Sequence, residues 1–448
     1  MTKTNIALFG AGLVAPPLIR YFLEREPYQI TIVSLETAET EKQFKGHPRC
    51  RIVRGGISDT ARLAREVGEA DLVVSLLPYV HHVTVARLCL EKGKPFLSTS
   101  YISPAMKELD RPAREKVLLF LNEIGLDPGI DHLAAMKIID DVHARGGKVA
   151  SFRSFCGGLP APEANDNPLG YKFSWSPRGV LLAGRKPAAY RENGELRKVE
   201  GGAELFRSRR PVSIPGVEEK LEFYPNRDSL SYIEPYGIPE VRTMLRATLR
   251  YPGWCEVLEN FFALHLVADD PPQKFAGQTL ASWFRGKTGL PAAGPMQAAL
   301  AQKLGCPEDS SVVKAFAWLG FFEEKPLPLA EGNTLDLLSA LLQSRLAYRP
   351  GERDLIVLHH EFEAVFPAPA SGERITATLV DYGVPHGDSA MARTVSLPAA
   401  IAARLILEGK IKATGVRAPL TREIYEPVLQ ELAELKIKFQ ETTTPLSA

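Results

Sequence analysis

The sequence has few cysteines, and their spacing excludes two common kinds of scaffold. Five cysteines are spread over 448 residues. None forms a CxxC pair, which argues against a disulfide framework and against a structural zinc site. The histidine pairs at 81–82 and 359–360 lack partners at ligand spacing, so we expect no metal. We interpret the cysteines as reduced thiols of a cytoplasmic protein.

An excess of charge of one sign and a long apolar run are also missing. Lys and Arg number 54 and Asp and Glu 53, a formal net charge of +1, so nucleic acid is not an expected partner. No stretch reaches the roughly 18–20 apolar residues that cross a bilayer, and the N-terminus has no secretory pattern. We therefore expect a protein without a membrane partner. The chain is long enough for two or three domains.

The first 125 residues alternate between apolar strands and helical patterns. A strand at 5–9 precedes Gly10, Gly12 and Ala15, spaced as GxGxxA, and a helical pattern follows. In this arrangement the first glycine permits a sharp turn, the second lets a pyrophosphate approach the backbone, and the alanine keeps the helix close to the strand. Further strands are expected at 29–34, 50–56, 71–78 and 94–100. The pattern predicts an α/β Rossmann-type, doubly wound parallel sheet that binds a dinucleotide.

From residue 125 onward the composition of the sequence changes, and segments rich in Gly, Pro and Asn appear. The stretches 125–132, 155–179 and 224–239 are predicted as long loops that are aromatic enough to hold a ligand. An amphipathic helix is expected within 327–348. After residue 395 two helices are expected, at 396–411 and 424–439, around a loop at 414–421.

Several of these segments resemble a known family. STSYISPAM (98–106), GLDPGIDHLAAMKIID (125–140), the stretches 155–185 and 224–240, and RATLRYPGWCEVL (246–258) resemble, in this order, signature segments of saccharopine reductases, within the saccharopine dehydrogenase family. The resemblance implies a Rossmann domain built from 1–125 with 395–448. An inserted α+β domain for substrate binding and dimerisation would span 126–394, and the protein would be a homodimer.

The resemblance also implies an activity. Such enzymes interconvert saccharopine with L-glutamate and 2-aminoadipate 6-semialdehyde by nicotinamide hydride transfer to or from an imine, in lysine biosynthesis or degradation. Two alternatives remain open: an enzyme of polyamine synthesis similar to carboxynorspermidine or carboxyspermidine dehydrogenase, and a non-catalytic dinucleotide-binding subunit. Saccharopine carries three carboxylates, so its site needs cations, whereas a polyamine end needs acids.

Candidate catalytic and substrate residues follow from the resemblance and from residue chemistry. Arg227 is the first candidate for a carboxylate clamp, because guanidinium offers a bidentate fork, although it could instead pair with Asp228. Tyr101 stands at a strand end, where open α/β sheets place ligands. Asp127 is expected to hold the substrate ammonium or the reacting amine, unless it only forms an Asx turn. Asp127 and Tyr101 are the expected catalytic residues. The full expected substrate set is Ser100, Tyr101, Asp127, Cys156, Leu169, Gly170, Phe173, Arg227, Thr248, Leu249 and Arg250.

Other charged residues have less specific interpretations. Arg178 and Lys172 flank an aromatic segment and could add positive potential or be solvated. Asp131 and His132 suggest a general base, but neighbours at a helix start do not face each other, so we expect Asp131 to cap a helix.

The end of the second strand bears on the choice of cofactor. Fungal members of the family that use NADP carry Cys-Arg-Thr there, and this chain has Ser34, Leu35 and Glu36. A carboxylate repels a 2′-phosphate and accepts hydrogen bonds from a ribose, so we expect NAD(H) over NADP(H), unless Lys42 or Arg54 reaches in. The expected cofactor contacts are Gly10, Gly12, Leu13, Val14, Ala15, Ser34, Leu35, Glu36, Ile57, Ser58, Ser75, Leu76, Leu77 and Pro78.

Overall fold

The computed structural model describes residues 3–367 and 372–446. The chain folds into two compact units, one made of residues 1–147 with 387–440 and the other of 148–386 with 441–448. These limits differ from the expected domain limits at 125 and 395, because the helix at 130–144 belongs to the first unit. The functions expected of the two segments stay predictions.

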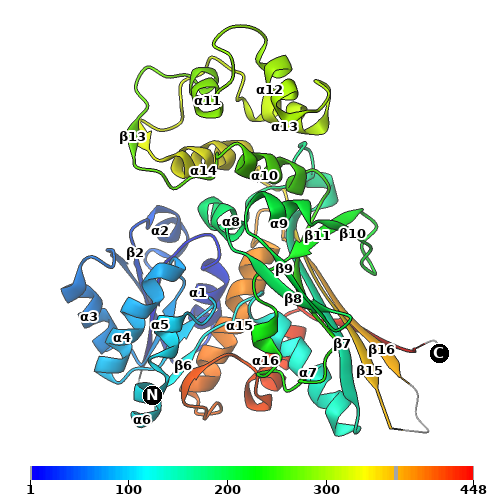
Figure 1. Cartoon of the computed structure of the whole chain (residues 1–448). Coiled ribbons are helices and arrows are strands. Elements are labelled where there is room, and N and C mark those ends of the chain that lie inside the picture. The colour runs from blue at the N-terminus through cyan, green and yellow to red at the C-terminus, as the bar shows by residue number, and fades with distance from the viewer. Residues whose placement is uncertain (1–2, 368–371, 447–448) are drawn as a thin grey trace. The chain divides into compact units, whose positions relative to one another are not determined.

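A parallel sheet forms the centre of the first unit. Its seven described strands lie in the order β17-β6-β5-β4-β1-β2-β3, and each pairs with its neighbours in parallel. The strands are β1 (Thr4–Phe9), β2 (Tyr28–Ser34), β3 (Cys50–Arg54), β4 (Leu72–Ser75), β5 (Phe96–Ser98), β6 (Leu119–Leu121) and β17 (Gly415–Arg417) (Figure 1). The strand order reverses between β1 and β4, which confirms the doubly wound class and places the ligand crevice at the carboxyl ends of these strands.

Helices of the first unit pack beside this sheet. They are α1 (Pro16–Leu23), α2 (Ala38–Phe44), α3 (Thr60–Glu69), α4 (His82–Lys92), α5 (Pro104–Lys107), α6 (Asp110–Glu115), α7 (Ile130–Ala144), α15 (Ala390–Leu407) and α16 (Arg422–Glu434). Helix α4 is followed by its C-cap residue Gly93, which has φ +67°, the left-handed conformation that glycine favours at helix ends. Helix α15 is long and apolar enough to cross a membrane by length and composition alone, but 67% of that stretch is buried within the protein.

The C-terminal part of the first unit adds to the same sheet. The segment expected as a loop at 414–421 contains β17, which pairs in parallel with β6. That prediction was wrong because a three-residue strand has too little periodicity to be recognised in the sequence. The hydroxyl of Tyr21 on α1 donates to Glu431 on α16 at 2.6 Å and accepts from Arg404 on α15 at 2.7 Å. This network ties both C-terminal helices to α1.

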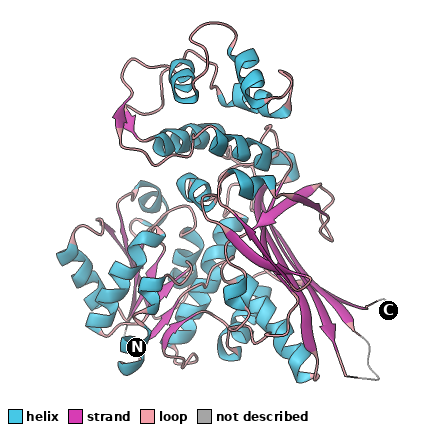
Figure 2. Ribbon diagram, in the orientation of Figure 1, coloured by secondary structure: helices cyan, strands magenta, loops and turns pink. Residues whose placement is uncertain are grey.

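A mixed sheet forms the centre of the second unit (Figure 2). The order along its main path is β10-β11-β12-β7-β15-β16-β18, and β8 pairs with β12 and β9. The strands are β7 (Lys148–Pro160), β8 (Ala188–Glu192), β9 (Glu195–Val199), β10 (Arg210–Val212), β11 (Leu221–Pro225), β12 (Thr243–Arg250), β15 (Asp354–Val365), β16 (Glu373–Tyr382) and β18 (Gln440–Pro445), with β13 (Gln273–Lys274) and β14 (Glu331–Gly332) forming a separate pair.

One expected loop begins as part of this sheet. Residues 155–160, with two glycines and a proline, continue strand β7: all of them pair with β15, and Phe155 and Cys156 also pair with β12. A side chain at Gly157 would come within 2.8 Å of the Leu249 backbone, so the glycine allows the close approach of β12. The prediction of a loop over 155–160 was wrong because β15, which is distant in the sequence, pairs with the whole of this glycine-rich stretch and holds it extended.

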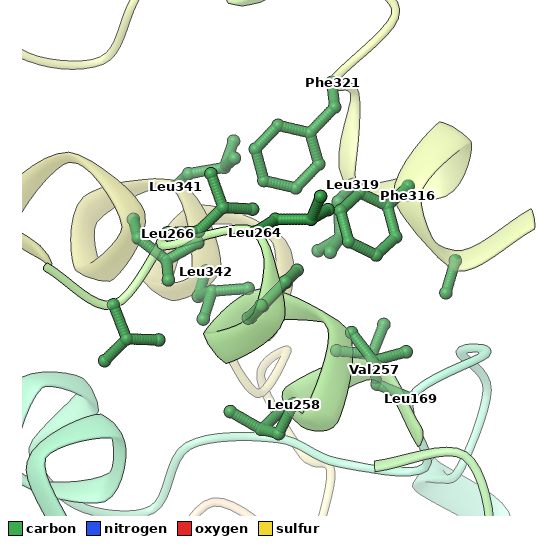
Figure 3. Packing of buried hydrophobic residues seen from close by; sticks show 14 of the residues in the cluster. Leu169, Val257, Leu258, Leu264, Leu266, Phe316, Leu319, Phe321, Leu341 and Leu342 are labelled. Carbon is green, nitrogen blue, oxygen red and sulfur yellow. The ribbon is translucent and has the colours of Figure 1, made fainter. Parts of the chain in front are cut away.

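The helices of the second unit enclose an apolar core. They are α8 (Pro177–Ala183), α9 (Ala203–Arg207), α10 (Trp254–Ala263), α11 (Leu280–Thr288), α12 (Met296–Leu304), α13 (Ser311–Leu319) and α14 (Thr334–Arg345). Figure 3 shows side chains from several of them gathered together, including Leu258 of α10, Leu319 of α13 and Leu342 of α14. Each of the three is at most 1% exposed. Helix α14 lies within the expected 327–348, and Asn333 caps it by accepting from the Asp336 N–H.

Candidate functional site

The turn after β1 leaves room and hydrogen-bond donors at the carboxyl edge of the first sheet. Gly10 has φ +92°, and a side chain there would lie 2.9–3.0 Å from the backbone of Leu76 and Leu77. A side chain at Gly12, in contrast, would have no neighbour within 4 Å among the described residues. The first two residues of α1, Pro16 and Pro17, have no N–H that could bind a ligand. The backbone N–H groups of Leu13 and Val14 do exist, and they donate to no group in the described part of the chain. These free amides beside an open glycine suit a phosphate.

Large apolar side chains are exposed around the same edge. Leu13 and Leu35 are each 65% exposed, Tyr79 is 61% and Val80 is 59% exposed. They follow β1, β2 and β4, so all four lie beyond carboxyl ends of neighbouring strands. Exposed apolar groups that gather in this way mark surfaces that another molecule covers. The other expected contacts at strand ends, Ile57, Ser58 and Pro78, are half-buried or exposed.

One acid and one cation stand at the ends of β2 and β3, and a second cation reaches them from helix α3. Ser34 pairs in register with Arg54 of β3, and the Gly55 N–H donates to the Ser34 carbonyl at 2.9 Å. Arg54 is exposed, and its guanidinium has no partner among the described residues. Arg62 donates to the Arg54 carbonyl at 2.6 Å. The Glu36 side chain is exposed. The sequence raised Arg54 as a possible cation here, and the pairing of β3 with β2 places it beside Ser34.

A buried histidine joins the ends of β4 and β5. The Ser75 hydroxyl lies 2.8 Å from Nδ1 of His82, and Nε2 of His82 lies 2.9 Å from the Ser100 hydroxyl. His82 is 4% exposed and its ring stands edge-on to Phe96. Burial lowers the pKa of His82 to about 4, with a smaller contribution from His81. The imidazole is therefore neutral at physiological pH.

The two expected catalytic residues meet in this unit. The Tyr101 hydroxyl donates to Oδ1 of Asp127 at 2.8 Å, and both residues are half-buried. Glu123 is buried, and its carboxylate accepts from the Ile102 N–H, next to Tyr101 in the sequence, and lies 2.9 Å from Nε2 of His132. The histidine expected as a candidate base is thus held by Glu123.

Asp131 stands in the first turn of α7, where its carboxylate accepts from the Gly129 N–H at 2.6 Å. The N-cap of α7 is Gly129, so the prediction that Asp131 caps this helix was wrong, and the carboxylate of Asp131 also lies 3.8 Å from Nδ1 of His132.

In the second unit, polar groups line one face of the sheet. Arg246, Thr248 and Arg250 alternate along β12, so they share a face. Cys156 of β7 and Tyr224 of β11 are both in register with Thr248. Burial raises the pKa of Tyr224 to about 12, so its hydroxyl is protonated and can donate.

Arg250 is a buried cation without a counter-charge. Its side chain is 6% exposed, and no carboxylate lies within ion-pair distance among the described residues. One nitrogen donates to the Leu249 carbonyl at 2.7 Å, while its Nε, like the indole N–H of Trp254, has no hydrogen-bond partner there. The guanidinium lies 5.0 Å from the Tyr171 ring and 5.7 Å from the Trp254 ring. Two unpaired donors and an uncompensated charge in one place suit an anionic ligand.

The apolar members of the expected substrate set are mostly core residues. Leu169 and Phe173 are 0% and 6% exposed and pack in the helical core of the second unit. Gly170 has φ +58°, and a side chain there would press on the Cβ of Tyr251. Leu249 points away from Arg250, into a cluster with Phe155 on the opposite face of the sheet. Ligand contact by these residues stays a prediction.

Other expected cations are engaged in ion pairs. Lys172 is buried and lies 2.7 Å from Glu352 and 2.9 Å from Asp166. Arg178 pairs with Asp336 and Asp269. These lysine and arginine charges are compensated within the protein.

Arg227 lies in the loop after β11, half-buried and with φ +55°. The carboxylate of the neighbouring Asp228 accepts from the Leu230 N–H at 2.9 Å. Within residues 3–367 and 372–446, no group of three or more His, Cys, Asp or Glu is placed to hold a metal ion.

Three residues of these sites were missed by reasoning from the sequence. His82 was considered only as a metal ligand, and Glu123 and Tyr224 were not considered. His82 follows a strand end and opens a helix, which was a usable signal for ligand-side placement. Glu123 and Tyr224 gain their positions from residues far away in the sequence, so no local pattern marks them.

Comparison with known proteins gives matches over nearly the whole chain. Residues 6–121 match the family described as "Saccharopine dehydrogenase NADP binding domain", and residues 125–437 match "Saccharopine dehydrogenase C-terminal domain". Saccharopine dehydrogenase [NADP(+), L-glutamate-forming] of Schizosaccharomyces pombe is 39% identical over 98% of both chains. The mitochondrial alpha-aminoadipic semialdehyde synthase of Bos taurus is 38% identical over 99% of this chain and 48% of its own length.

A solved structure agrees with these matches. The apo saccharopine dehydrogenase (L-Glu forming) of Saccharomyces cerevisiae has a TM-score of 0.86 and 37% identity, and the match covers 98% of this chain and 100% of that one.

The expected preference for NAD is overturned by these comparisons. The matching N-terminal family is an NADP binding domain, and the fungal relatives are named for NADP(+). The expectation gave weight to Glu36 and to the missing arginine after β2. It named Arg54 as a residue that could reverse the preference, but the pairing that places Arg54 beside Ser34 is a tertiary fact that the sequence does not show.

Proposed function

The chain belongs to the saccharopine dehydrogenase family, and we propose that it interconverts saccharopine with L-glutamate and 2-aminoadipate 6-semialdehyde, using NADP(H). The observation that carries this proposal is the 39% identity over 98% of both chains with a relative named for that activity. In the oxidative direction saccharopine, NADP⁺ and water give glutamate, the semialdehyde, NADPH and a proton. Glutamate keeps the bridging nitrogen, so the carbon that is oxidised is the one that becomes the aldehyde.

The carboxyl edge of the first sheet is proposed as the cofactor site. Gly12 offers room for a pyrophosphate, and the free amides of Leu13 and Val14 would donate to it. The exposed Leu13, Leu35 and Tyr79 would be covered by the bound dinucleotide. When bound, the nicotinamide supplies or accepts the hydride, and the protein contributes orientation and electrostatics.

Arg54 is proposed to recognise the 2′-phosphate. Its guanidinium is exposed and unpaired at the end of β3, next to the strand after which an adenosine ribose lies in this fold. Glu36 is exposed, so its carboxylate can turn into solvent and away from the phosphate. Arginine suits this role because its planar fork binds phosphate oxygens in a bidentate way.

Asp127 is proposed to handle the bridging nitrogen of the substrate. A carboxylate stabilises the secondary ammonium of saccharopine and can accept the proton that this nitrogen must lose before hydride leaves the neighbouring carbon. Tyr101 donates to Oδ1 of Asp127, which fixes the carboxylate in one orientation. The imine carbon then takes up water, and the nitrogen departs with glutamate once it has regained a proton.

Arg250 is proposed as an anchor for a substrate carboxylate. Its buried guanidinium lacks a counter-charge among the described residues, and the adjacent indole N–H of Trp254 lacks an acceptor. A carboxylate would satisfy both at once. Thr248 and Cys156 stand beside it on the same face of the sheet, and Arg227 is retained as a second candidate for the clamp.

Two further expectations are retained as proposals. A homodimer is supported by the family resemblance, and a cytoplasmic location by the scattered cysteines. Light scattering of the purified protein and fractionation of its source cells test these two points.

The activity is tested by incubating the protein with saccharopine and either NADP⁺ or NAD⁺ at mildly alkaline pH. Reduced nicotinamide is followed by absorbance, and glutamate and lysine are assayed separately. Glutamate formed with the semialdehyde supports the proposal. Lysine with 2-oxoglutarate would contradict it, and turnover of carboxynorspermidine alone would indicate the polyamine enzyme.

A further inference from the structure

The hydrogen-bonded chain Ser75–His82–Ser100 leads to a further inference about the first unit. His82 Nδ1 faces the Ser75 hydroxyl at 2.8 Å, and Nε2 faces the Ser100 hydroxyl at 2.9 Å. Burial keeps the ring neutral, with a pKa of about 4. A neutral imidazole donates through one nitrogen and accepts through the other, so the two serines must play opposite parts.

The burial of Ser75 decides which part each serine plays. Ser75 is 0% exposed, and its hydroxyl has no acceptor other than His82 in the described part of the chain. A buried hydroxyl proton without an acceptor is costly, so Ser75 donates to Nδ1. The proton of His82 then sits on Nε2, and Nε2 donates to the oxygen of Ser100.

The hydroxyl proton of Ser100 is consequently directed elsewhere. Ser100 is half-buried, and no second acceptor for it is found among the described residues. It lies just beyond the carboxyl end of β5 and directly precedes Tyr101. Because its oxygen already accepts from His82, it is a stronger donor than an isolated serine.

We propose that His82 is a positioning residue, which by donating from Nε2 fixes Ser100 as a hydrogen-bond donor to a carboxylate of the substrate. The identity of that ligand rests on the function proposed above, whereas the direction of the hydrogen bonds does not. His82 touches neither substrate nor cofactor in this scheme and acts through Ser100.

The direct test is ¹⁵N NMR of the histidine side chains at pH 7, with the His82 signals assigned by their loss in H82Q. We expect Nε2 to be protonated and Nδ1 to be unprotonated. The S75A variant, which removes the donor to Nδ1, should populate both tautomers. An unprotonated Nε2 in the wild-type protein, or a charged ring, would overturn the proposal. This measurement is independent of turnover, so inactivity toward saccharopine with the expected tautomer would refute the proposed function alone.

A second test uses kinetics of H82Q, S100A and the double variant. We expect H82Q and S100A each to raise KM for saccharopine about 10- to 100-fold, with a much smaller change in kcat. The double variant should match S100A, because His82 acts through Ser100. H143Q, which changes an exposed histidine on α7, is the control and should match the wild type. Additive effects of H82Q and S100A would contradict the proposal, as would a H82Q variant whose melting temperature falls while KM is unchanged.

Discussion

The hydroxyl of Tyr101 donates a 2.8 Å hydrogen bond to Oδ1 of Asp127, and these residues are 26 positions apart in the sequence. Tyr101 follows the strand end of β5, and Asp127 lies in the segment between β6 and α7. The pair joins a protonated phenol to a carboxylate beside the strand ends at which the cofactor is proposed to bind.

Asp127→Asn is expected to lower kcat about 10²- to 10⁴-fold, because an amide cannot accept the proton from the bridging nitrogen. Tyr101→Phe should have a smaller effect, about 10-fold, since it removes only the group that orients the carboxylate. Initial rates of NADPH formation measure both. Asp141→Asn, which neutralises an exposed aspartate on α7, is the matched control. A D127N variant with wild-type kcat would show that another residue takes the proton.

Arg250→Met is expected to raise KM for saccharopine about 10- to 100-fold, which is the effect of losing a hydrogen bond to a charged group. Met keeps much of the side-chain volume and removes a buried charge, so the fold should be retained. Arg178→Gln, in the same unit but paired with Asp336 and Asp269, should leave KM unchanged. Equal KM values for R250M and the wild type would remove Arg250 from the substrate site.

Arg54→Gln is expected to weaken NADPH binding about 10- to 100-fold and to leave NADH binding unchanged, because only NADPH carries the 2′-phosphate. Quenching of protein fluorescence by the dinucleotide gives both dissociation constants without turnover. Lys45→Gln, at the nearby end of α2, is the control for a general loss of positive charge. Parallel weakening for both dinucleotides would place Arg54 elsewhere than at the 2′-phosphate.

Asp270 predicts a pH dependence of stability in the second unit. Burial alone would raise its pKa, but Lys287 and hydrogen bonds from Thr334 outweigh this and lower the pKa from 3.8 to about 2. The unfolded chain therefore binds the proton more readily, so the stabilisation is complete above about pH 4 and is lost as the pH falls toward 2.

Asp270→Asn should destabilise the second unit by about 1–2 kcal/mol at pH 7, after allowance for the partial exposure of the carboxylate. The difference from the wild type should shrink between pH 4 and pH 2. Urea unfolding followed by circular dichroism at several pH values measures it. A difference that stays constant with pH would show that the charge of Asp270 has no such role.

Local sequence patterns were sufficient to predict the fold of much of the first unit. The strand ending at Phe9, the GxGxxA turn and the helix that follows it were all predicted, because each depends on residues within a few positions. The family resemblance, carried by long irregular segments, agrees with the matches to known proteins. What the sequence could not provide was pairing between distant segments. Residues 155–160 were expected as a loop because their glycines were visible and the neighbouring β12 and β15 were not.

In the candidate sites, too, single residues could be predicted from the sequence, whereas their arrangement in space could not. Tyr101 and Asp127 were selected separately and form a hydrogen bond in the structure. The tautomer of His82 and the position of Arg54 beside Ser34 depend on which strand ends are neighbours. Only the folded sheet reveals these neighbours. Charge at one position, Glu36, was therefore an insufficient guide to the cofactor.

The parallel pairing of β17 with β6 has a consequence for synthesis on the ribosome. Strand β6 ends at residue 121, and β17 begins at residue 415. The edge of the first sheet thus stays open while the whole of the stretch 148–386 is translated, and α15 and α16 are not yet present to cover α1. During this interval the nascent chain is expected to expose apolar surface and an unpaired strand edge, the two features that favour aggregation of incompletely folded chains.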